Sequence, residues 1–344
     1  MYSFRNDYSE GAHPQVLQAL TDTNLVQTCG YGVDPICEEA RDLIRTVCAA
    51  PEADVHFLVG GTQTNLTVIT ALLASYEAVI AAHTGHVNCH ETGAIEATGH
   101  KVCVETSPDG KVTPAMVEAV LARHDGSEHM VSPKMVYISD TTEIGTVYTK
   151  AELTALRHCC DEHGLLLFLD GARLGSALTS PESDLTLADL AALTDVFTIG
   201  GTKNGLLMGE AVVVFDDNIN DHYRWMIKQN CGMLAKGRLI GVQFEALLEG
   251  GEDSLFYEIG AKENRLAKKL REGIAAAGYQ FDGTSTTNQI FPIFPTEMVR
   301  KLEEDFFFYD WAPYGDSHRV VRLVTSWGTT EEDVDAFINA LNNF

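Results

Sequence analysis

The chain has 344 residues, of which 45% are hydrophobic, and a formal net charge of −25. This length predicts about two domains, and the excess of acid argues against nucleic acid and anionic membranes as partners. No apolar run approaches the roughly 20 residues that a membrane helix needs, and the first residues lack the apolar segment of a signal peptide. The eight cysteines show no paired zinc spacing, so we expect reduced thiols, no bound metal and a cytoplasmic protein.

The first 33 residues are only weakly periodic. We expect one short helix over residues 14–20, and polar and aromatic side chains gather at residues 5–9. An irregular surface arm and a segment that lines an active site are both compatible with this stretch. A helix is predicted next, over residues 34–49, where Asp34 is a candidate N-cap and Pro35 lies in the first turn.

A glycine-rich turn opens the following helix. A short strand over residues 56–59 leads into Gly-Gly-Thr-Gln at 60–63, and an apolar helix is expected over 66–74. Such a turn is typical of an anion site, because free N–H groups and the helix dipole point at the anion. A tight turn with a threonine N-cap is the alternative.

The middle of the chain alternates strands with helices. A strand over 78–82 precedes several histidines whose spacing is not diagnostic of a metal, and we expect a helix to begin near Glu91. Further strands are expected over 101–105, 135–139, 165–170, 195–200 and 206–215, with helices over 113–123 and 150–163. Repeated β–α units predict a largely parallel sheet and therefore an α/β domain.

Two of these strands lead into chemically capable residues. Asp170 ends one apolar run, and Lys203 lies just past another, in a turn bracketed by glycines. Ligands of an open α/β sheet bind beyond the carboxyl ends of its strands. Pyridoxal phosphate (PLP) needs a lysine for its Schiff base and an acid that keeps its pyridine nitrogen protonated. A solvated loop lysine and a helix N-cap are the ordinary interpretations of each residue alone, but the pair predicts a PLP site.

The last third of the chain predicts a smaller α+β domain. Helical segments over 222–250 precede a long amphipathic helix over 254–277, and we place the domain boundary near its start, between residues 1–250 and 251–344. Strands are expected over 290–294 and 320–324, and helices over 296–305 and 331–344. Arg322 lies inside an apolar strand, where a charge is costly unless it is paired. It either binds a substrate carboxylate or points outward from an edge strand.

The Asp-Gly-Ala-Arg-Leu motif at 170–174, together with the glycine-flanked Lys203, resembles the threonine aldolase branch of the β-eliminating lyase-like family. These are PLP enzymes of the aspartate-aminotransferase fold type, and the resemblance extends over nearly the whole chain. The segment Thr202-Lys203-Asn204-Gly205 departs from the Ser-Lys-Gly that is commoner in the family. The resemblance implies an α/β PLP domain with a mostly parallel sheet and a small α+β domain.

The resemblance also implies roles for individual residues. Lys203, Asp170 and His86, which would stack on the PLP ring, are expected to be catalytic. The expected cofactor-binding residues are Gly61, Thr62, Gln63, His86, Asp170, Thr202, Lys203 and Arg238. The expected substrate-binding residues are Asn6, Tyr31, Arg173 and Arg322. Because Tyr31 and Arg238 match positions that serve a neighbouring subunit's site, we expect a homo-oligomer, either a dimer or a tetramer.

The function that the resemblance implies is an L-threonine or allo-threonine aldolase, which cleaves a β-hydroxy-α-amino acid to glycine and an aldehyde. Many family members have a histidine where this chain has Thr142, so the base for the β-hydroxyl stays open between His86, Glu143 and a water. Two other functions stay open: another PLP β-eliminating lyase of the same fold, and a non-catalytic protein that keeps the fold for binding.

Overall fold

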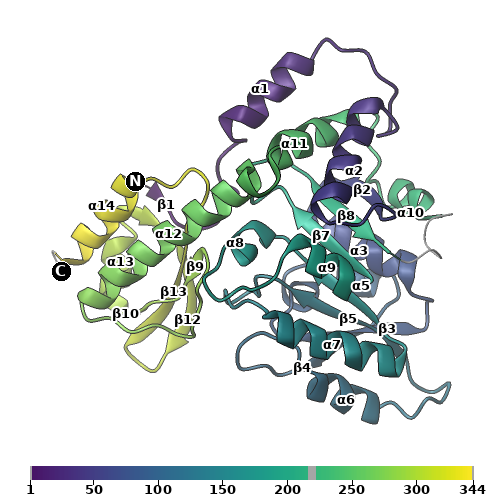
Figure 1. Cartoon of the computed structure of the whole chain (residues 1–344). Helices are drawn as coiled ribbons and strands as arrows, with labels where there is room; N and C mark the ends of the chain where they lie inside the picture. The colour runs from purple at the N-terminus through teal and green to yellow at the C-terminus, as the bar shows by residue number, and fades with distance from the viewer. Residues whose placement is uncertain (1, 216–221, 343–344) are drawn as a thin grey trace.

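The computed structural model describes residues 2–215 and 222–342. They form a large α/β body around a seven-stranded sheet and a smaller body around an antiparallel sheet, and one long helix runs from the first body to the second (Figure 1). The predicted combination of an α/β part with a small α+β part is therefore confirmed.

The seven-stranded sheet has the order β2-β8-β7-β6-β5-β3-β4. Its strands are β2 (Asp54–Leu58), β3 (Glu77–Ala82), β4 (Val102–Glu105), β5 (Ser132–Ser139), β6 (Leu166–Asp170), β7 (Val196–Gly200) and β8 (Glu210–Val214). Neighbours are parallel except that β8 is antiparallel to both β2 and β7. The strand expected from residue 206 begins only at Glu210, because the N–H groups of Gly201 and Thr202 both bind the Gly209 carbonyl and close a turn.

Helices cover both faces of this sheet, which explains its uninterrupted apolar strands. Successive side chains of a strand point to opposite faces, and in β6 Leu167 and Leu169 enter one core while Phe168 enters another. The first core is covered by helices α1 (Pro14–Thr23), α2 (Pro35–Val47), α6 (Pro114–Ala122), α7 (Lys150–His163), α8 (Leu174–Leu178), α9 (Leu187–Leu193) and α11 (Arg238–Leu248). The second is covered by α3 (Gly61–Leu72) and α10 (Tyr223–Gln229).

Side-chain caps fix the start of some of the predicted helices. The Asp34 carboxylate accepts a hydrogen bond from the Cys37 N–H at 3.0 Å, and Thr113 caps α6. The single helix expected near Glu91 is wrong. Two one-turn helices lie there, α4 (His86–Cys89) and α5 (Ala94–Ala97), and Glu91 is buried between them. The prediction failed because this segment is built around a buried polar contact rather than an apolar stripe.

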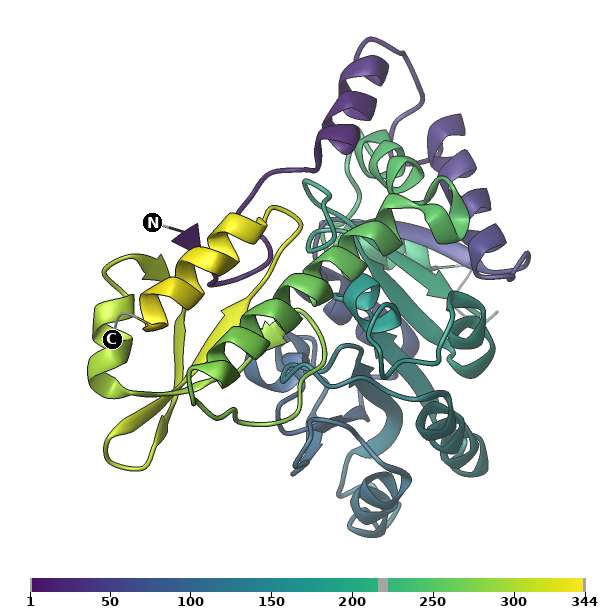
Figure 2. The same ribbon diagram turned by 60° about the vertical axis from the view of Figure 1, so that its left-hand side comes forward.

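The smaller body packs its sheet against the long helix α12 (Leu255–Ala276) (Figure 2). The 3-10 turn η1 (Gly251–Asp253) precedes α12. The other elements of the small body are β9 (Gln289–Ile290), β10 (Ile293–Pro295), α13 (Thr296–Leu302), β12 (Tyr309–Tyr314), β13 (His318–Val324) and α14 (Glu331–Asn342). Strand β1 (Tyr2–Ser3) pairs in parallel with β11 (Phe306–Phe307), and Phe4 packs into the same core. The division at residue 250 stays a prediction, although the amino-terminal strand lies in the small body.

Two further observations concern the chain as a whole. All eight cysteines are free. Within residues 2–215 and 222–342, no helix has the length and apolar character to cross a membrane.

Candidate active site

A cavity of about 590 Å³ opens at the carboxyl end of the parallel strands, with its outer wall formed by the small sheet. This volume and position are typical of small-molecule sites in α/β proteins. Of the predicted site residues, those that line it are Gly61, Thr62, His86, Arg173, Thr202, Lys203 and Arg322. A recess of about 40 Å³ at its base reaches Asp170. The structure therefore brings together residues from opposite ends of the chain.

Lys203 lies in the turn between β7 and β8. A side chain at Gly201 would meet the Gly209 carbonyl oxygen at 2.7 Å, so this close approach requires glycine. Burial and then the charge of Arg173 lower the pKa of the Lys203 amine, while the carboxylates of Asp7, Asp170 and Glu210 act in the opposite sense. A lowered pKa increases the share of neutral amine, which is the form that attacks a carbonyl carbon.

Asp170 ends β6 and is held by three donors. Its Oδ1 accepts from the Ala172 N–H at 3.0 Å, and its Oδ2 accepts from the Tyr137 hydroxyl at 2.6 Å and the Asn65 amide at 2.9 Å. Helix α8 begins only after Arg173 and has no side-chain cap. The interpretation of Asp170 as a helix N-cap is therefore wrong, and its carboxylate is fixed beside the recess.

His86 is oriented by a buried carboxylate. Its Nδ1 lies 2.7 Å from Oε1 of Glu91, and the same oxygen accepts from the Asn65 amide at 2.7 Å. Because a carboxylate oxygen accepts, Nδ1 is the donor and carries the ring proton. Asn65 thus connects the groups that hold His86 and Asp170, and it fixes both side chains from α3.

The glycine turn leaves open space at the amino end of α3. Gly60 is the N-cap and has no side chain to bind the first N–H groups. A Cβ at Gly60 or Gly61 would meet no atom within 4 Å, and both residues line the cavity. The alternative of a threonine N-cap is wrong, and the free N–H groups of a 12-residue helix face the space where an anion would bind.

The two arginines of the cavity differ in their partners. Arg173 donates from Nε and Nη2 to the carboxylate of Asp7 at 2.6 and 3.0 Å. Burial alone would raise the pKa of Asp7, but Arg173, the Lys203 charge and the Asn288 amide together outweigh it and lower the pKa to about 2. Arg322 has no carboxylate partner among the described residues, and its Nε is buried without a hydrogen bond. Its guanidinium lies over Tyr309 and Trp311, at 5.0 and 5.1 Å from the ring centroids.

The environment of Arg322 corrects one interpretation of this residue. Strand β13 pairs with β12 on one side and with β9 and β10 on the other. It is therefore a central strand, and the alternative of an outward-facing edge-strand arginine is wrong. Burial, followed by the charge of Arg173, lowers the pKa of Arg322. An anion bound beside the guanidinium would offset both burial and the charge of Arg173, and would raise the pKa of Arg322 again.

Glu143, one candidate for the β-hydroxyl base, and Thr142, which replaces the histidine of many family members, lie in different places. Glu143 lines the cavity, and its Oε1 accepts from the Ser139 hydroxyl at 2.6 Å and the His86 N–H at 2.9 Å. Burial raises its pKa. Thr142 is buried, and its hydroxyl binds that of Thr146 at 2.7 Å. Its side chain is therefore engaged outside the cavity.

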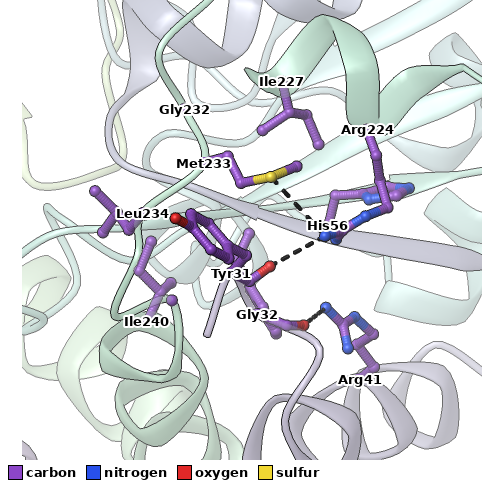
Figure 3. A pocket seen from close by; sticks show the side chains of 12 residues that line it. Tyr31, Gly32, Arg41, His56, Arg224, Ile227, Gly232, Met233, Leu234 and Ile240 are labelled. Atoms are coloured by element: carbon purple, nitrogen blue, oxygen red, sulfur yellow. Dashed lines mark hydrogen bonds between the residues drawn. The ribbon is translucent and has the colours of Figure 1, made fainter. Parts of the chain in front are cut away.

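Four predicted site residues do not line the cavity. Gln63 bridges the Val59 N–H and the Asn230 carbonyl. The Asn6 amide oxygen accepts from the Tyr8 N–H and the Ser9 hydroxyl. Arg238 donates to the carbonyls of Thr23 and Asn24. Tyr31 borders a separate surface pocket, where Arg224 donates to the Tyr31 carbonyl at 3.1 Å (Figure 3).

Several residues of this site were not predicted from the sequence to belong to it. They are Asp7, Asn65, Glu91, Tyr137 and Glu210, each buried against a predicted site residue or within the cavity wall. Asn65 had a usable signal, because it lies one helical turn after Gly61. The others carry no local pattern, and their partners are fixed only by the tertiary fold.

The fold and the site together define a class of protein. A lysine and a buried aspartate at the carboxyl ends of a mostly parallel sheet, closed by a small α+β body, are the arrangement of the aspartate-aminotransferase fold type. The solved aspartate aminotransferase of Thermus thermophilus has the same fold, with a TM-score of 0.74 and 18% identity over 100% of this chain and 91% of that one.

The chain belongs to the β-eliminating lyase family, whose model matches residues 4–295. It is 30% identical to the low-specificity L-threonine aldolase of Pseudomonas aeruginosa over 336 residues, which cover 96% of this chain and 94% of the relative. A solved threonine aldolase of Leishmania major has 49% identity and a TM-score of 0.97, over 100% of this chain and 99% of that one. The predicted family is thus confirmed.

Proposed function

We propose that this protein is a PLP-dependent aldolase that cleaves threonine, allo-threonine and related β-hydroxy-α-amino acids to glycine and an aldehyde. The observation that carries the proposal is the convergence of Lys203, Asp170 and Arg322 on one cavity and its recess. An amine, a fixed acid and an unpaired guanidinium are the groups that a PLP enzyme of amino acids needs. The threonine aldolases of Pseudomonas and Leishmania, matched over nearly their whole length, support this activity.

The residues present fit PLP. The Lys203 amine has a lowered pKa, which favours a covalent link to an aldehyde. The space beside Gly60 and Gly61 would be filled by a Cβ and lies at free N–H groups, as a phosphate site requires. When bound, PLP withdraws electrons from the carbon at which a substrate bond breaks.

Each residue of the cavity then has a task that its contacts support. Lys203 would hold the cofactor, and Gly61 and Thr62 would bind its phosphate. Asp170, fixed by Tyr137 and Asn65, would keep the proton on the pyridine nitrogen. His86 would pack its flat ring against the cofactor, because the bond to Glu91 fixes its orientation.

Arg322 is the stronger candidate for the substrate carboxylate. Arg173 already has two hydrogen bonds to the Asp7 carboxylate, so it would act through its remaining Nη1. Arg322 has no such partner among the described residues and lies at the outer wall of the cavity. A guanidinium holds a carboxylate by two parallel hydrogen bonds and thereby orients the bond that breaks.

The proton of the β-hydroxyl has two possible acceptors in the cavity wall. Glu143 and His86 both line the cavity, and the raised pKa of Glu143 makes it a better base near neutral pH. A Glu143→Gln variant that keeps PLP and glycine binding but loses cleavage would assign the role to Glu143. A His86→Gln variant with the same behaviour would assign it to His86, and full activity of both variants would favour a water.

One assay separates the candidate functions. Purified protein with PLP is given threonine, allo-threonine and phenylserine, and the products are identified. Glycine with an aldehyde supports the aldolase, whereas pyruvate or another keto acid with ammonia would identify a β-eliminating lyase. A protein that binds PLP and turns over no amino acid, with cysteine, tyrosine and tryptophan also supplied, would be the non-catalytic alternative.

We also propose a homo-oligomer in the cytoplasm. Exposed apolar side chains gather on the loop between α1 and α2 and on the adjacent α10: Leu25, Val26, Tyr31, Val33 and Trp225. Tyr31 and Arg238 lie outside the cavity of their own chain, which supports a role at a neighbour's site. Eight free cysteines are consistent with a reducing compartment. Sedimentation would distinguish a dimer from a tetramer.

A further inference from the structure

Glu210 is a buried acid of the cavity wall to which the proposed function gives no task. It begins β8, where it pairs with Gly200 at the end of β7, and only 5% of its surface is exposed. It borders the main cavity together with Thr202 and Lys203. Because a buried carboxyl is costly unless it is bound or protonated, its presence beside the lysine turn calls for a reason.

Three carboxylates act on the Lys203 amine, and each comes from a different element: Asp7 from the amino-terminal arm, Asp170 from β6 and Glu210 from β8. Arg173 is the positive group that acts on the amine. The other titratable or charged groups that line the cavity are His86, His90, Glu143, Tyr8, Tyr309, Asp310 and Arg322. Glu210 must therefore be compared with Asp7 and Asp170 before any task is assigned.

Asp7 and Asp170 are committed to other donors. Asp7 accepts two hydrogen bonds from Arg173 and one from the Asn288 amide. Asp170 accepts from Tyr137, Asn65 and a backbone N–H. These contacts give both carboxylates partners outside the turn that carries Lys203.

Glu210 has fewer hydrogen-bond partners than Asp7 and Asp170. Its Oε2 accepts from the Gly201 N–H at 3.2 Å, and the Thr202 side chain is its other hydrogen-bonding neighbour. Burial raises the pKa of Glu210 to about 7, against the lowering effect of Thr202 and of the Lys203 charge. Glu210 and Lys203 line the same cavity, and the Gly201 N–H that Glu210 binds lies two residues before the lysine.

We infer that Glu210 is a positioning residue, which holds the turn of Lys203 through the Gly201 N–H and whose carboxylate favours the charged form of the lysine nitrogen. The inference rests on the proposed function, because it takes Lys203 as the residue that holds PLP.

The test is a pH titration of the visible absorption of PLP bound to the protein, which requires no turnover. An adjacent negative charge favours the protonated nitrogen. The midpoint should therefore fall from the parent through E210D, whose carboxylate is set back, to E210Q, where we expect a fall of about one pH unit. The matched control is E263Q. Glu263 is a buried carboxyl of α12 that binds Ser176 and does not line the cavity, so its variant should keep the parental midpoint.

The outcomes are distinct. If a Glu210 variant has a native circular dichroism spectrum and the parental midpoint, the inference is overturned. If E210Q does not fold, the midpoint of E210D alone tests the inference. An equal shift in E263Q would also overturn it, because the effect would then not belong to Glu210. A parent protein that gains no visible absorption with PLP would instead contradict the proposed function.

Discussion

Single charged residues of the cavity owe their state to partners that are distant in the sequence. Arg173 is held by Asp7, which lies 166 positions earlier, and Arg322 approaches the carbonyl of Arg5 at 3.3 Å. The arm thus neutralises one arginine and leaves the other without a carboxylate partner among the described residues. This asymmetry is the basis for assigning the substrate carboxylate to Arg322.

Lys203→Ala should give a folded protein that, after free PLP is removed, lacks the absorption band of PLP on a lysine, because no other lysine lines the cavity among the described residues. Absorption and circular dichroism measure the two properties separately. Lys236→Ala, at a basic turn away from the cavity, is the control and should keep the absorption. A Lys203 variant with the parental band and turnover would place the covalent link at another residue.

Arg322→Lys and Arg322→Ala should keep the absorption of bound PLP and lose most cleavage. Removing one partner of a buried charge pair costs roughly 2–5 kcal/mol, and a lysine lacks the planar fork of donors. Glycine binding, followed by its spectral change, should weaken in both variants. Arg319→Ala, on the same strand but paired with Asp310 at 2.7 Å, is the control. Parental glycine affinity in Arg322→Ala would move the carboxylate site towards Arg173.

The Asp7–Arg173 pair predicts a pH dependence of stability. The pKa of Asp7 falls from 3.8 to about 2 on folding, so its contribution is present above pH 4 and is lost as the pH falls towards 2. A shift of this size corresponds to about 2 kcal/mol. The difference in unfolding free energy between parent and Asp7→Asn, from urea titrations, should shrink by this amount between pH 5 and pH 2. Asp316→Asn, at an exposed aspartate, should show no such trend, and a constant difference for Asp7→Asn would refute the argument.

Among single residues, the sequence predicts the site residues that directly follow an apolar strand. It does not predict the residues that hydrogen-bond to them. Asp170 and Lys203 are recognisable because each follows an apolar run, and Arg322 because a charge interrupts one. Glu91 and Tyr137 are ordinary in their local sequence. Their roles come from hydrogen bonds that close only when α3, α4, β5 and β6 pack together.

Among the elements, helix α12 connects the two bodies. Its first half packs into the core of the large body through Leu255, Phe256 and Ile259, and its second half packs into the small core through Leu266 and Leu270. Between these halves, Gly260 lies against the backbone of α8, where a Cβ would meet the Gly175 carbonyl oxygen at 2.2 Å. Helix α12 is therefore held on α8 by a close approach that only glycine allows.

Gly260→Ala should destabilise the protein by roughly 1–3 kcal/mol, because the atom in the way belongs to a backbone that cannot rotate aside. The cavity lies between the joined bodies, so glycine affinity should fall as well. Urea unfolding and glycine titration measure the two effects. Gly11→Ala, where a Cβ meets nothing within 4 Å, is the control. An unaltered unfolding midpoint in Gly260→Ala would mean that the helices separate without cost.

The elements that the sequence predicts well are those with local causes. Parallel strands and their helices follow from apolar runs of about five residues and from capping residues. Strands β1, β11 and β12 were not expected. The first two have only two residues each and pair with each other across the chain, and β12 is largely exposed, with no apolar alternation.

At the scale of the whole molecule, several exposed apolar side chains lie on adjoining segments, the loop between α1 and α2 and helix α10. Leu25 is 90% exposed and Trp225 is 75% exposed. Isolated exposed apolar residues are normal, but larger apolar patches are typical of interaction surfaces. Tyr31 lies in this loop, and Arg238 donates to the carbonyls of Thr23 and Asn24 at its start, so both residues that are predicted to serve a neighbour's site adjoin these side chains.

Sedimentation of the parent should therefore show a dimer or a tetramer, and Leu25→Glu combined with Trp225→Glu should yield a smaller species. Activity should fall with the loss of assembly if Tyr31 and Arg238 serve a neighbouring site. Tyr314→Glu, a change at an exposed tyrosine of the small sheet, is the control and should keep the parental mass. A fully active monomeric parent would contradict the proposed assembly.

The pairing of β1 with β11 has a consequence for synthesis on the ribosome. Tyr2 emerges long before its partner Phe306, which is made 304 residues later, and this separation takes about 15–60 s at about 5–20 residues per second. During that interval the arm that carries Asp7 has no strand to join. Until β11 has been made, the arm stays unpaired. Slow synthesis should therefore expose the arm to proteases more than the other segments of the small body.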